Sequence, residues 1–141
     1  MKQFTSISRS GDVKEAVPEK YMIKELNEQP FADVYTRDLG IEEKDIETQT
    51  FINPLGRIIG GEVFIVSLKE LQPDKSITCY RKVNPKDKLY IMQIGDLKSI
   101  YKSTIDHIRG DFKQISGVYS INCAFRYILF QQHNCVNEYF T

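Results

Sequence analysis

The sequence predicts an α+β domain in which an antiparallel sheet of at least four strands carries helices packed on one face. Several short segments rich in β-branched and aromatic residues follow one another without an intervening helical pattern. Two other segments repeat apolar residues at helical spacing. Strands that succeed each other without helices between them pair antiparallel, and this favours the α+β class over a parallel α/β sheet.

The first residues differ in character from those that follow. Residues 1–18 are polar and are interrupted by Gly11 and Pro18, so we interpret them as an irregular lead-in. We expect the domain itself to span residues 19–141. Its first element is a short strand expected over residues 20–26, where apolar and polar side chains alternate.

Two helices are expected. The first begins at Pro30, because proline suits the first turn of a helix, and ends at Gly40. The second spans residues 96–109, with Asp96 as N-cap and Gly110 just beyond the end. We expect the second helix to pack on the sheet through three apolar side chains, namely Ile100, Ile105 and Ile108.

The middle of the chain predicts a series of strands bounded by turn signals. The polar run 42–47 leads back to extended structure, and the strands are expected over residues 48–52, 61–67, 76–83 and 87–94. The last two are so close in sequence that a hairpin is the economical connection. A further extended run is expected over residues 116–122, whereas periodicity leaves residues 123–132 open between strand and helix.

Composition and charge exclude several classes of protein. The 19 basic and 19 acidic residues give a net charge of zero, so we expect no nucleic-acid partner. No basic amphipathic segment indicates direct membrane contact, and residues 1–10 hold no apolar run long enough for a signal peptide. Three cysteines are an odd number that does not suit a disulfide scaffold. We therefore expect a cytoplasmic protein.

Several segments follow one another in an order that resembles a known family. They are a strand, turn, proline and helix over residues 21–40, a Pro-Leu-Gly element at 54–56, a strand at 63–68, a turn and strand over 84–92, Gly95-Asp96 before a helix, and a Cys-x-x-Arg at 123–126. Their order and spacing over residues 20–130 resemble the C-terminal half of the FIST sensor domain, named for F-box and intracellular signal-transduction proteins.

Two departures from the family pattern accompany this resemblance. The family's strand at 63–68 usually carries an arginine, whereas Val66 or Ser67 stands in that place here. The chain also stops at Thr141, before the Gly-Phe-x-x-Tyr-Gly-Glu-like stretch that closes the family's domain. We therefore expect the domain to lack its closing segment and the larger N-terminal half.

The resemblance implies a sensory input domain of a signal-transduction protein rather than an enzyme. The implied ligand is a small molecule such as an amino acid, and the implied partners are a signalling output domain or the N-terminal half of the same protein. No cofactor is implied. The alternative interpretation is a protein-interaction or dimerisation module without a small-molecule ligand, which would present an exposed apolar patch.

Arg126, Arg57 and Cys123 are the candidate ligand-binding residues. A carboxylate is best held by the two parallel N–H groups of a guanidinium, and Arg126 lies in the most apolar stretch of the chain. Arg57 follows the Pro-Leu-Gly turn, where a loop side chain could swing over a pocket. The structural alternatives are that Arg126 pairs with an internal carboxylate and that Cys123 packs as a small hydrophobe.

Other reactive side chains predict neither catalysis nor metal binding. Three possible zinc ligands are His133, Cys135 and Cys123, which lies twelve residues before Cys135. Their spacing does not match a recognised zinc site. His107 sits on the second helix with no thiol or hydroxyl partner near it in sequence. The three glycines at 56, 60 and 61 do not match a phosphate loop and are interpreted as hairpin glycines. The acidic residues of the 42–47 run are interpreted as solvated.

Overall fold

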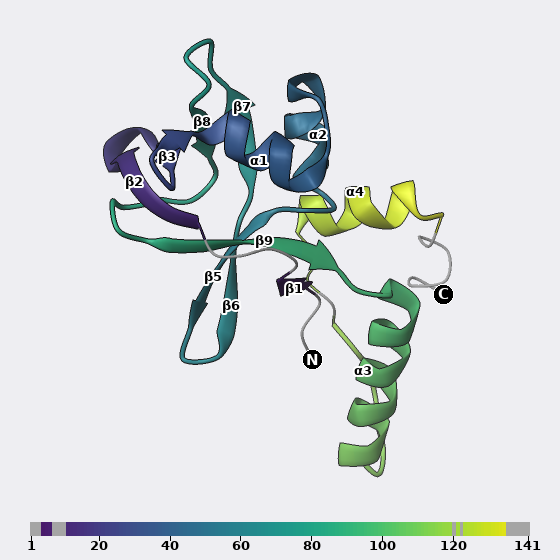
Figure 1. Cartoon of the computed structure of the whole chain (residues 1–141). Helices are drawn as coiled ribbons and strands as arrows, with labels where there is room; N and C mark the ends of the chain where they lie inside the picture. Colours follow the sequence, from purple (N-terminus) through teal and green to yellow (C-terminus); the bar gives the residue numbers. More distant parts are fainter. Residues whose placement is uncertain (1–3, 7–10, 120, 122, 135–141) are drawn as a thin grey trace. The chain divides into compact units, whose positions relative to one another are not determined.

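A computed structural model of the chain describes residues 4–6, 11–119, 121 and 123–134. These residues divide into two compact units, one from Phe4 to Gln93 and one comprising the described residues from Ile94 onward. Figure 1 labels strands and helices of both units. The first contains the sheet and the second is helical, so the chain belongs to the α+β class as predicted.

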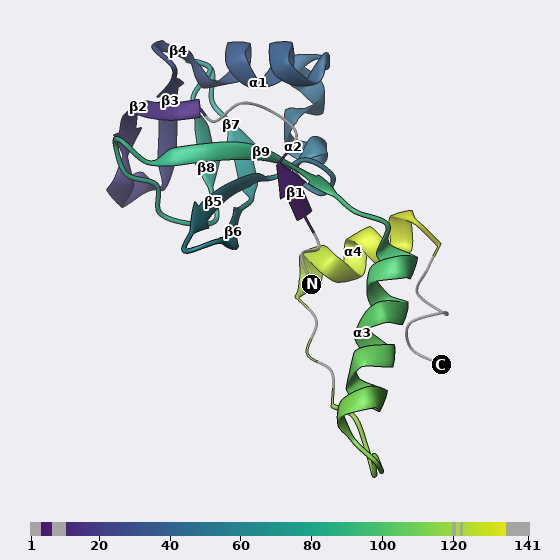
Figure 2. The same cartoon turned by 60° about the horizontal axis from the view of Figure 1, so that its bottom comes forward.

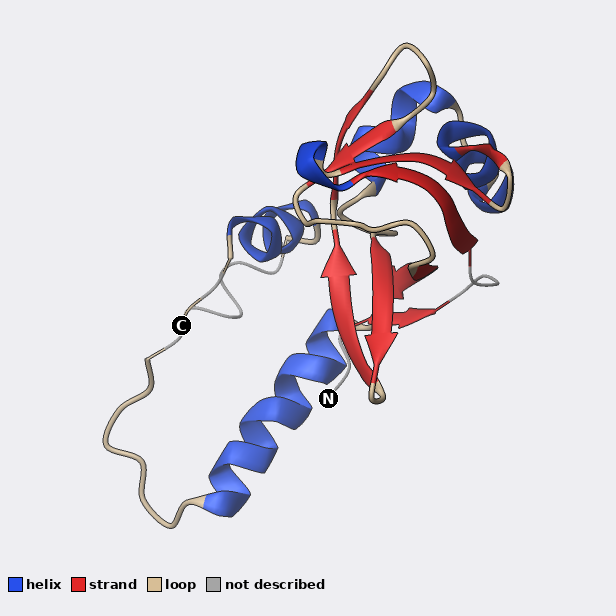
Figure 3. Cartoon of the chain, turned by 90° about the vertical axis from the view of Figure 1, so that its left-hand side faces the viewer, coloured by secondary structure: helices blue, strands red, loops and turns tan. Residues whose placement is uncertain are grey.

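An antiparallel sheet forms the first unit, with strand order β6-β5-β9-β2-β3-β8-β7. Its strands are β2 (Gly11–Val17), β3 (Met22–Leu26), β5 (Leu55–Ile59), β6 (Glu62–Val66), β7 (Leu68–Leu71), β8 (Ile77–Cys79) and β9 (Lys88–Ile94). Two short strands join beside this path: β1 (Phe4–Ser6) pairs with β9, and β4 (Gln29–Pro30) pairs with β3. Figure 3 draws these strands in red.

Helices accompany the sheet within the same unit. Helix α1 (Phe31–Leu39) packs against β3, and α2 (Ile46–Gln49) packs against β7 (Figure 3). Two 3-10 turns, η1 (Pro18–Lys20) and η2 (Glu43–Asp45), complete the connections. A single core joins the strands to these helices through buried side chains, the largest being Tyr35, Phe31, Ile23, Ile46, Leu55, Leu68, Ile77 and Leu89.

The helix expected from Pro30 to Gly40 is confirmed in detail. Pro30 is the N-cap of α1, and Gly40 adopts a left-handed conformation with φ of 66° just after the last residue. The Gly40 N–H donates to Thr36 O, which closes the last turn. The face of the helix that carries Phe31 and Tyr35 is buried, and their rings stack with centroids 5.4 Å apart.

The interpretation of residues 1–18 as an irregular lead-in is wrong for residues 11–17. They form β2, which pairs with β3 on one side and with β9 on the other. Gly11 and Val13 are buried while Asp12 and Lys14 are exposed, so the strand has the alternation of a half-buried sheet. This alternation was not recognised in the sequence because the segment contains a glycine and several charged residues.

The prediction of a strand over residues 48–52 is also wrong, as is the prediction that the polar run 42–47 leads into extended structure. Residues 43–49 form η2 and α2, and a turn follows. The β-branched Thr48 and Thr50 favour a strand locally, but Ile46 is fully buried at the start of α2 and Thr50 is committed to a side-chain hydrogen bond. Tertiary contacts therefore override the local preference.

The pairing expected between the last two middle strands differs as well. Strand β8 pairs with β7 and β3, whereas β9 pairs with β5 and β2. The hairpins of the middle region are instead β5–β6 and β7–β8. Neither β5 nor β7 was predicted from the sequence. The strands expected over 61–67 and 87–94 are confirmed as β6 and β9, and 76–83 is reduced to β8.

The second unit contains α3 (Leu97–Asp111) and α4 (Ala124–Gln132), both visible in Figure 2. Asp96 caps α3 as expected, since its side chain accepts from the backbone N–H groups of Lys98 and Ser99. The helix continues through Gly110 to Asp111, two residues further than expected. Packing of this helix on the sheet stays a prediction.

The end of the chain resolves one open alternative and overturns one expectation. Residues 124–132 are helical, whereas the described residues among 116–122 form no strand. Ser120 and Asn122 lie outside the described residues. Within the described ranges, no helix combines the length and the apolar character needed to cross a membrane.

Candidate functional site

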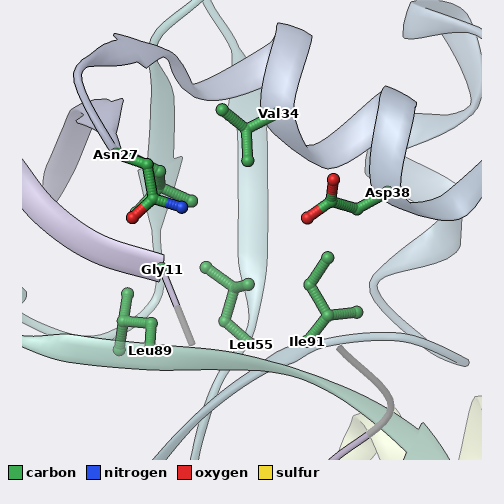
Figure 4. Close-up of a pocket in the computed structure, with 8 residues that line it drawn as sticks. Gly11, Asn27, Val34, Asp38, Leu55, Leu89 and Ile91 are labelled. Carbon is green, nitrogen blue, oxygen red and sulfur yellow. The ribbon is translucent and has the colours of Figure 1, made fainter. Parts of the chain in front are cut away.

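A small hollow lies in the first unit beside α1, the turn after β3 and the strands β5 and β9 (Figure 4). Its lining is apolar except for two polar side chains; the residues are Gly11, Leu26, Asn27, Val34, Asp38, Leu55, Leu89 and Ile91. The space available to the centre of a water molecule is about 10 Å³, which is room for about one water. A larger molecule enters only if the surrounding elements separate.

Asn27 is held on one side of the hollow by the turn between β3 and β4. Asn27 and Glu28 have φ values of 51° and 64°, as in the two-residue turn that joins antiparallel strands. The Asn27 Oδ1 accepts from Asp12 N at 2.9 Å, and the Asn27 N–H donates to Asp12 O at 2.9 Å. The amide group is thereby fixed with its nitrogen turned toward the hollow (Figure 4).

Asp38 faces the hollow from the last turn of α1. Its carboxylate is directed inward in Figure 4, and Oδ1 accepts from Arg37 Nε at 3.1 Å. The side chain is 27% exposed. A negative charge near the C-terminus of a helix is electrostatically unfavourable, because the unpaired carbonyl groups carry negative partial charge there. Helix stability therefore does not explain an aspartate at this position.

A buried hydrogen-bond network supports the floor of the hollow next to Leu55. Asn53 O accepts from Tyr35 Oη at 2.6 Å, Asn53 Oδ1 accepts from Gln49 Nε2 at 2.6 Å, and Asn53 Nδ2 donates to Met92 O at 2.9 Å. Burial raises the pKa of Tyr35 well above its usual value, so its hydroxyl stays a neutral donor. The network fixes the turn from which β5 and Leu55 begin.

Gly56 follows Leu55 at a position where the side chain of Met92 leaves no room for a Cβ atom. A Cβ atom added there would lie 2.6 Å from Cγ and Sδ of Met92, which is fully buried. The Pro-Leu-Gly element that carries the family resemblance thus has a structural reason for its glycine. It lets β5 approach β9 closely while Leu55 faces the hollow.

Arg57, the second candidate for ligand binding, lies in β5 rather than in a loop. Its Nη2 donates to Asp87 Oδ2 at 2.5 Å and to Lys82 O at 3.2 Å. Asp87 Oδ2 also accepts from Asn84 N at 2.8 Å, so Arg57 ties β5 to the turn that precedes β9. Arg57 is not among the residues that line the hollow, and its guanidinium is engaged in holding this turn.

Arg126 and Cys123 belong to the second unit. Cys123 is the N-cap of α4 and is exposed, and Arg126 is exposed in the first turn of the same helix. The structural alternative that Cys123 packs as a small hydrophobe is therefore wrong, and the apolar residues around Arg126 do not bury it. Arg126 lies in the second unit and Arg57 in the first.

The other candidate reactive groups have ordinary surroundings. Burial raises the pKa of the Cys79 thiol to about 12, so this cysteine stays protonated at neutral pH. His107 Nε2 lies 3.4 Å from Asp111 Oδ2 on the exposed surface of α3. His133 is the C-cap of α4, and Cys135 lies outside the described residues. In the part of the chain that the structure describes, no three His, Cys, Asp or Glu residues gather as a metal site would require.

Two acidic side chains interpreted as solvated serve the fold. Glu43 pairs with Lys75 at 3.1 Å, and Glu47 Oε1 accepts from Leu71 N at 2.9 Å. Conversely, neither Asn27 nor Asp38 was predicted from the sequence as a site residue. Asn27 looked like an ordinary turn residue, and the one available signal for Asp38 was an acidic residue two positions before the glycine that ends its helix.

The sheet and its accompanying helices form an α+β domain with a small, mostly apolar hollow. The family model of the FIST C domain matches residues 32–140, and the chain belongs to this family. FIST C domains are sensor-type domains associated with signal transduction and are not known as catalysts. No curated protein and no solved structure matches the chain.

Proposed function

We propose that this chain is a sensory input domain whose hollow binds a small ligand with an ammonium group, an amino acid being the first choice. The main support for this proposal is that Asn27 and Asp38 both turn polar groups toward a space otherwise lined by apolar side chains. Small-molecule sites commonly combine an apolar lining with a few convergent polar groups.

The two polar groups suit the two ends of an amino acid. The Asp38 carboxylate accepts hydrogen bonds from an ammonium group, and charge-assisted bonds of this kind are stronger than neutral ones. The Asn27 side-chain nitrogen donates to a carboxylate oxygen of the same ligand. The apolar lining, which includes Val34 and Leu89, then receives the ligand side chain. This role accounts for an acidic residue at the unfavourable end of α1.

Ligand binding would also require a change in the position of α1. Because the hollow holds about one water, a ligand must push α1 away from the β3–β4 turn or from β5 and β9. A ligand that binds only the opened form shifts the population toward it. We propose that this shift passes to an output domain or to the N-terminal half of the protein. The free thiols of Cys79 and Cys123 are consistent with action in the cytoplasm.

Arg126 remains a candidate for the ligand carboxylate. Its guanidinium offers two parallel N–H groups that suit a carboxylate, whereas the Asn27 amide offers donors of a single nitrogen. The variants Arg126→Gln and Asn27→Ala separate the two assignments. Each is compared with the unmodified chain for binding of amino acids and for its melting temperature without ligand.

The central test is a thermal-shift screen against the amino acids, followed by calorimetry of any hit, using the chain and its Asp38→Asn variant. Binding to the native state raises the melting temperature by mass action. We expect Asp38→Asn to weaken binding about tenfold or more, roughly 1.4 kcal/mol per tenfold. The control Asp45→Asn, an aspartate of the same unit outside the hollow, should bind normally. Equal affinity of Asp38→Asn and the unmodified chain would overturn the assignment.

A further inference from the structure

The strand at one end of the sheet, β6, presents an open edge. The strand order begins with β6, and in the described part of the chain β6 pairs only with β5 (Figure 1). Its sequence is Glu-Val-Phe-Ile-Val, in which Phe64 is 42% exposed and Val63 and Ile65 are half-buried. Exposed apolar edge strands are templates for pairing with another chain.

The register of the β5–β6 hairpin shows which backbone groups face outward. Gly60 and Gly61 have φ values of 58° and 83°, as in a two-residue turn in which the flanking pair, Ile59 and Glu62, is hydrogen-bonded. Hydrogen-bonded and non-hydrogen-bonded pairs alternate along antiparallel strands. The N–H and C=O groups of Val63 and Ile65 therefore point away from β5, toward the open edge.

The usual protective features of an edge are missing from β6. Sheet edges are commonly blunted by lysine, proline or a bulge. The strand carries none of these, and its register with β5 is continuous over all five residues. Its single charge, Glu62, lies at the end next to the turn.

We propose that β6 pairs antiparallel with β6 of a second copy of this chain, in the register that places Phe64 opposite Phe64 of the partner copy. Val63 of each copy then lies opposite Ile65 of the other, and the outward backbone groups of these two residues meet in two hydrogen-bonded pairs. Between them, the phenylalanines form the non-hydrogen-bonded pair, in which opposing side chains come closest.

The charges of the chain are compatible with this self-pairing. In the proposed register Glu62 lies opposite Val66 of the partner copy, so no like charges oppose each other across the new strand pair. The whole chain has 19 acidic and 19 basic residues, so two copies do not repel each other through net charge. A pair of five-residue strands is a small interface, and we expect a weak dimer that forms with rising concentration.

The test is analytical ultracentrifugation of the chain from a few micromolar to several hundred micromolar, with two edge variants and one control. Val63→Pro removes an outward N–H that β5 does not use, and proline is tolerated where an edge N–H faces solvent. Phe64→Lys places a charge at the centre of the pairing. The control Ile59→Lys puts the same charge in the same hairpin but on the inner strand, at a residue 56% exposed.

We expect the unmodified chain and Ile59→Lys to dimerise alike, and both edge variants to raise the dissociation constant at least tenfold. Circular dichroism and melting at low concentration verify that each variant is folded. Amide exchange should also slow with concentration at Val63 and Ile65 but not at Phe64, whose N–H already faces β5. A chain that stays monomeric over the whole range, or that dimerises equally in both edge variants, overturns the proposal. So does concentration-independent protection of Val63 and Ile65, because it indicates that another strand covers the edge.

Discussion

The two edge strands of the sheet, β7 and β6, differ in how their outward backbone groups are satisfied. At the β7 edge, α2 packs against the strand, and side chains from the segment before β5 satisfy backbone donors: Thr50 accepts from Leu68 N at 2.8 Å and Glu47 accepts from Leu71 N at 2.9 Å. The strand itself carries Lys69 and Glu70. At the β6 edge the outward backbone donors and acceptors belong to an apolar strand.

This difference shows how side chains close a sheet within one chain. An unpaired N–H group at a buried position is costly, so it needs an acceptor from a side chain, another strand or water. The segment 43–50 supplies such acceptors for β7 because η2 and α2 bring it alongside that edge. Nothing comparable serves β6 in the described residues, so within the first unit one edge of the sheet is closed by side chains and the other is open.

The largest expected difference between the edges concerns side-chain truncation. Leu68→Ala should destabilise the chain by about 3 kcal/mol, because Leu68 is 1% exposed and its loss leaves a cavity. Phe64→Ala should cost about 1 kcal/mol or less, because Phe64 is 42% exposed. Urea unfolding at a few micromolar protein, where self-association is absent, measures both. Equal losses would mean that the β6 edge is as well packed as the β7 edge.

A smaller effect is expected when the closed edge loses one side-chain acceptor. Thr50→Val keeps the shape of the side chain but leaves the buried Leu68 N–H without its partner, and should cost about 2 kcal/mol. Thr48→Val is the matched control, since Thr48 is exposed and its hydroxyl donates to Asp45 O within the same segment. If both variants unfold at the same urea concentration, the side-chain closure of this edge contributes no stability.

The smallest effect is a pH dependence confined to the closed side. Burial raises the pKa of Cys79, opposite Leu68 in the β7–β8 pair, from 9.0 to about 12. Above pH 9 the unfolded chain loses this proton while the folded chain keeps it. The stability contributed by the protonated thiol is therefore present below pH 9 and is lost as pH rises toward 12; between pH 9 and 10, the range tested, the loss is about 1 kcal/mol.

The variant Cys79→Ala checks this pH dependence. Its stability should fall less steeply between pH 9 and 10 than that of the unmodified chain, although its stability at neutral pH is lower. Cys123→Ala, which changes an exposed cysteine, should keep the original slope. Urea unfolding at a series of pH values provides the comparison, and identical slopes in all three proteins would contradict the assigned cause.

Local signals predicted the parts of the fold that local interactions determine. The proline and glycine that bound α1, and the aspartate that caps α3, act within a few residues, so sequence alone placed these helices closely. Strand β9 was placed for a similar reason, since turn signals precede its apolar alternation. The resemblance to the FIST family was likewise carried by short turn and strand motifs.

Elements that depend on distant partners were not predictable in this way. Strand β5 contains Gly56 and Arg57, which look unfavourable until Met92 and Asp87 are seen to require them. Residues 48–52 were misinterpreted because Thr50, which favours a strand locally, instead accepts a hydrogen bond from Leu68 N at the β7 edge. The hollow was missed because Asn27 and Asp38 face the same space only once α1 packs against β3.

The position of β2 has a consequence for folding and for where the domain begins. It joins the β5–β6–β9 half of the sheet to the β3–β7–β8 half, and it does so by pairing residues near position 12 with residues near position 88. Contacts this distant in sequence close late and slowly during folding. The family match starts at residue 32, after β2 and β3. A fragment cut at the boundaries of that match would therefore lose the strand that makes the two halves a single sheet.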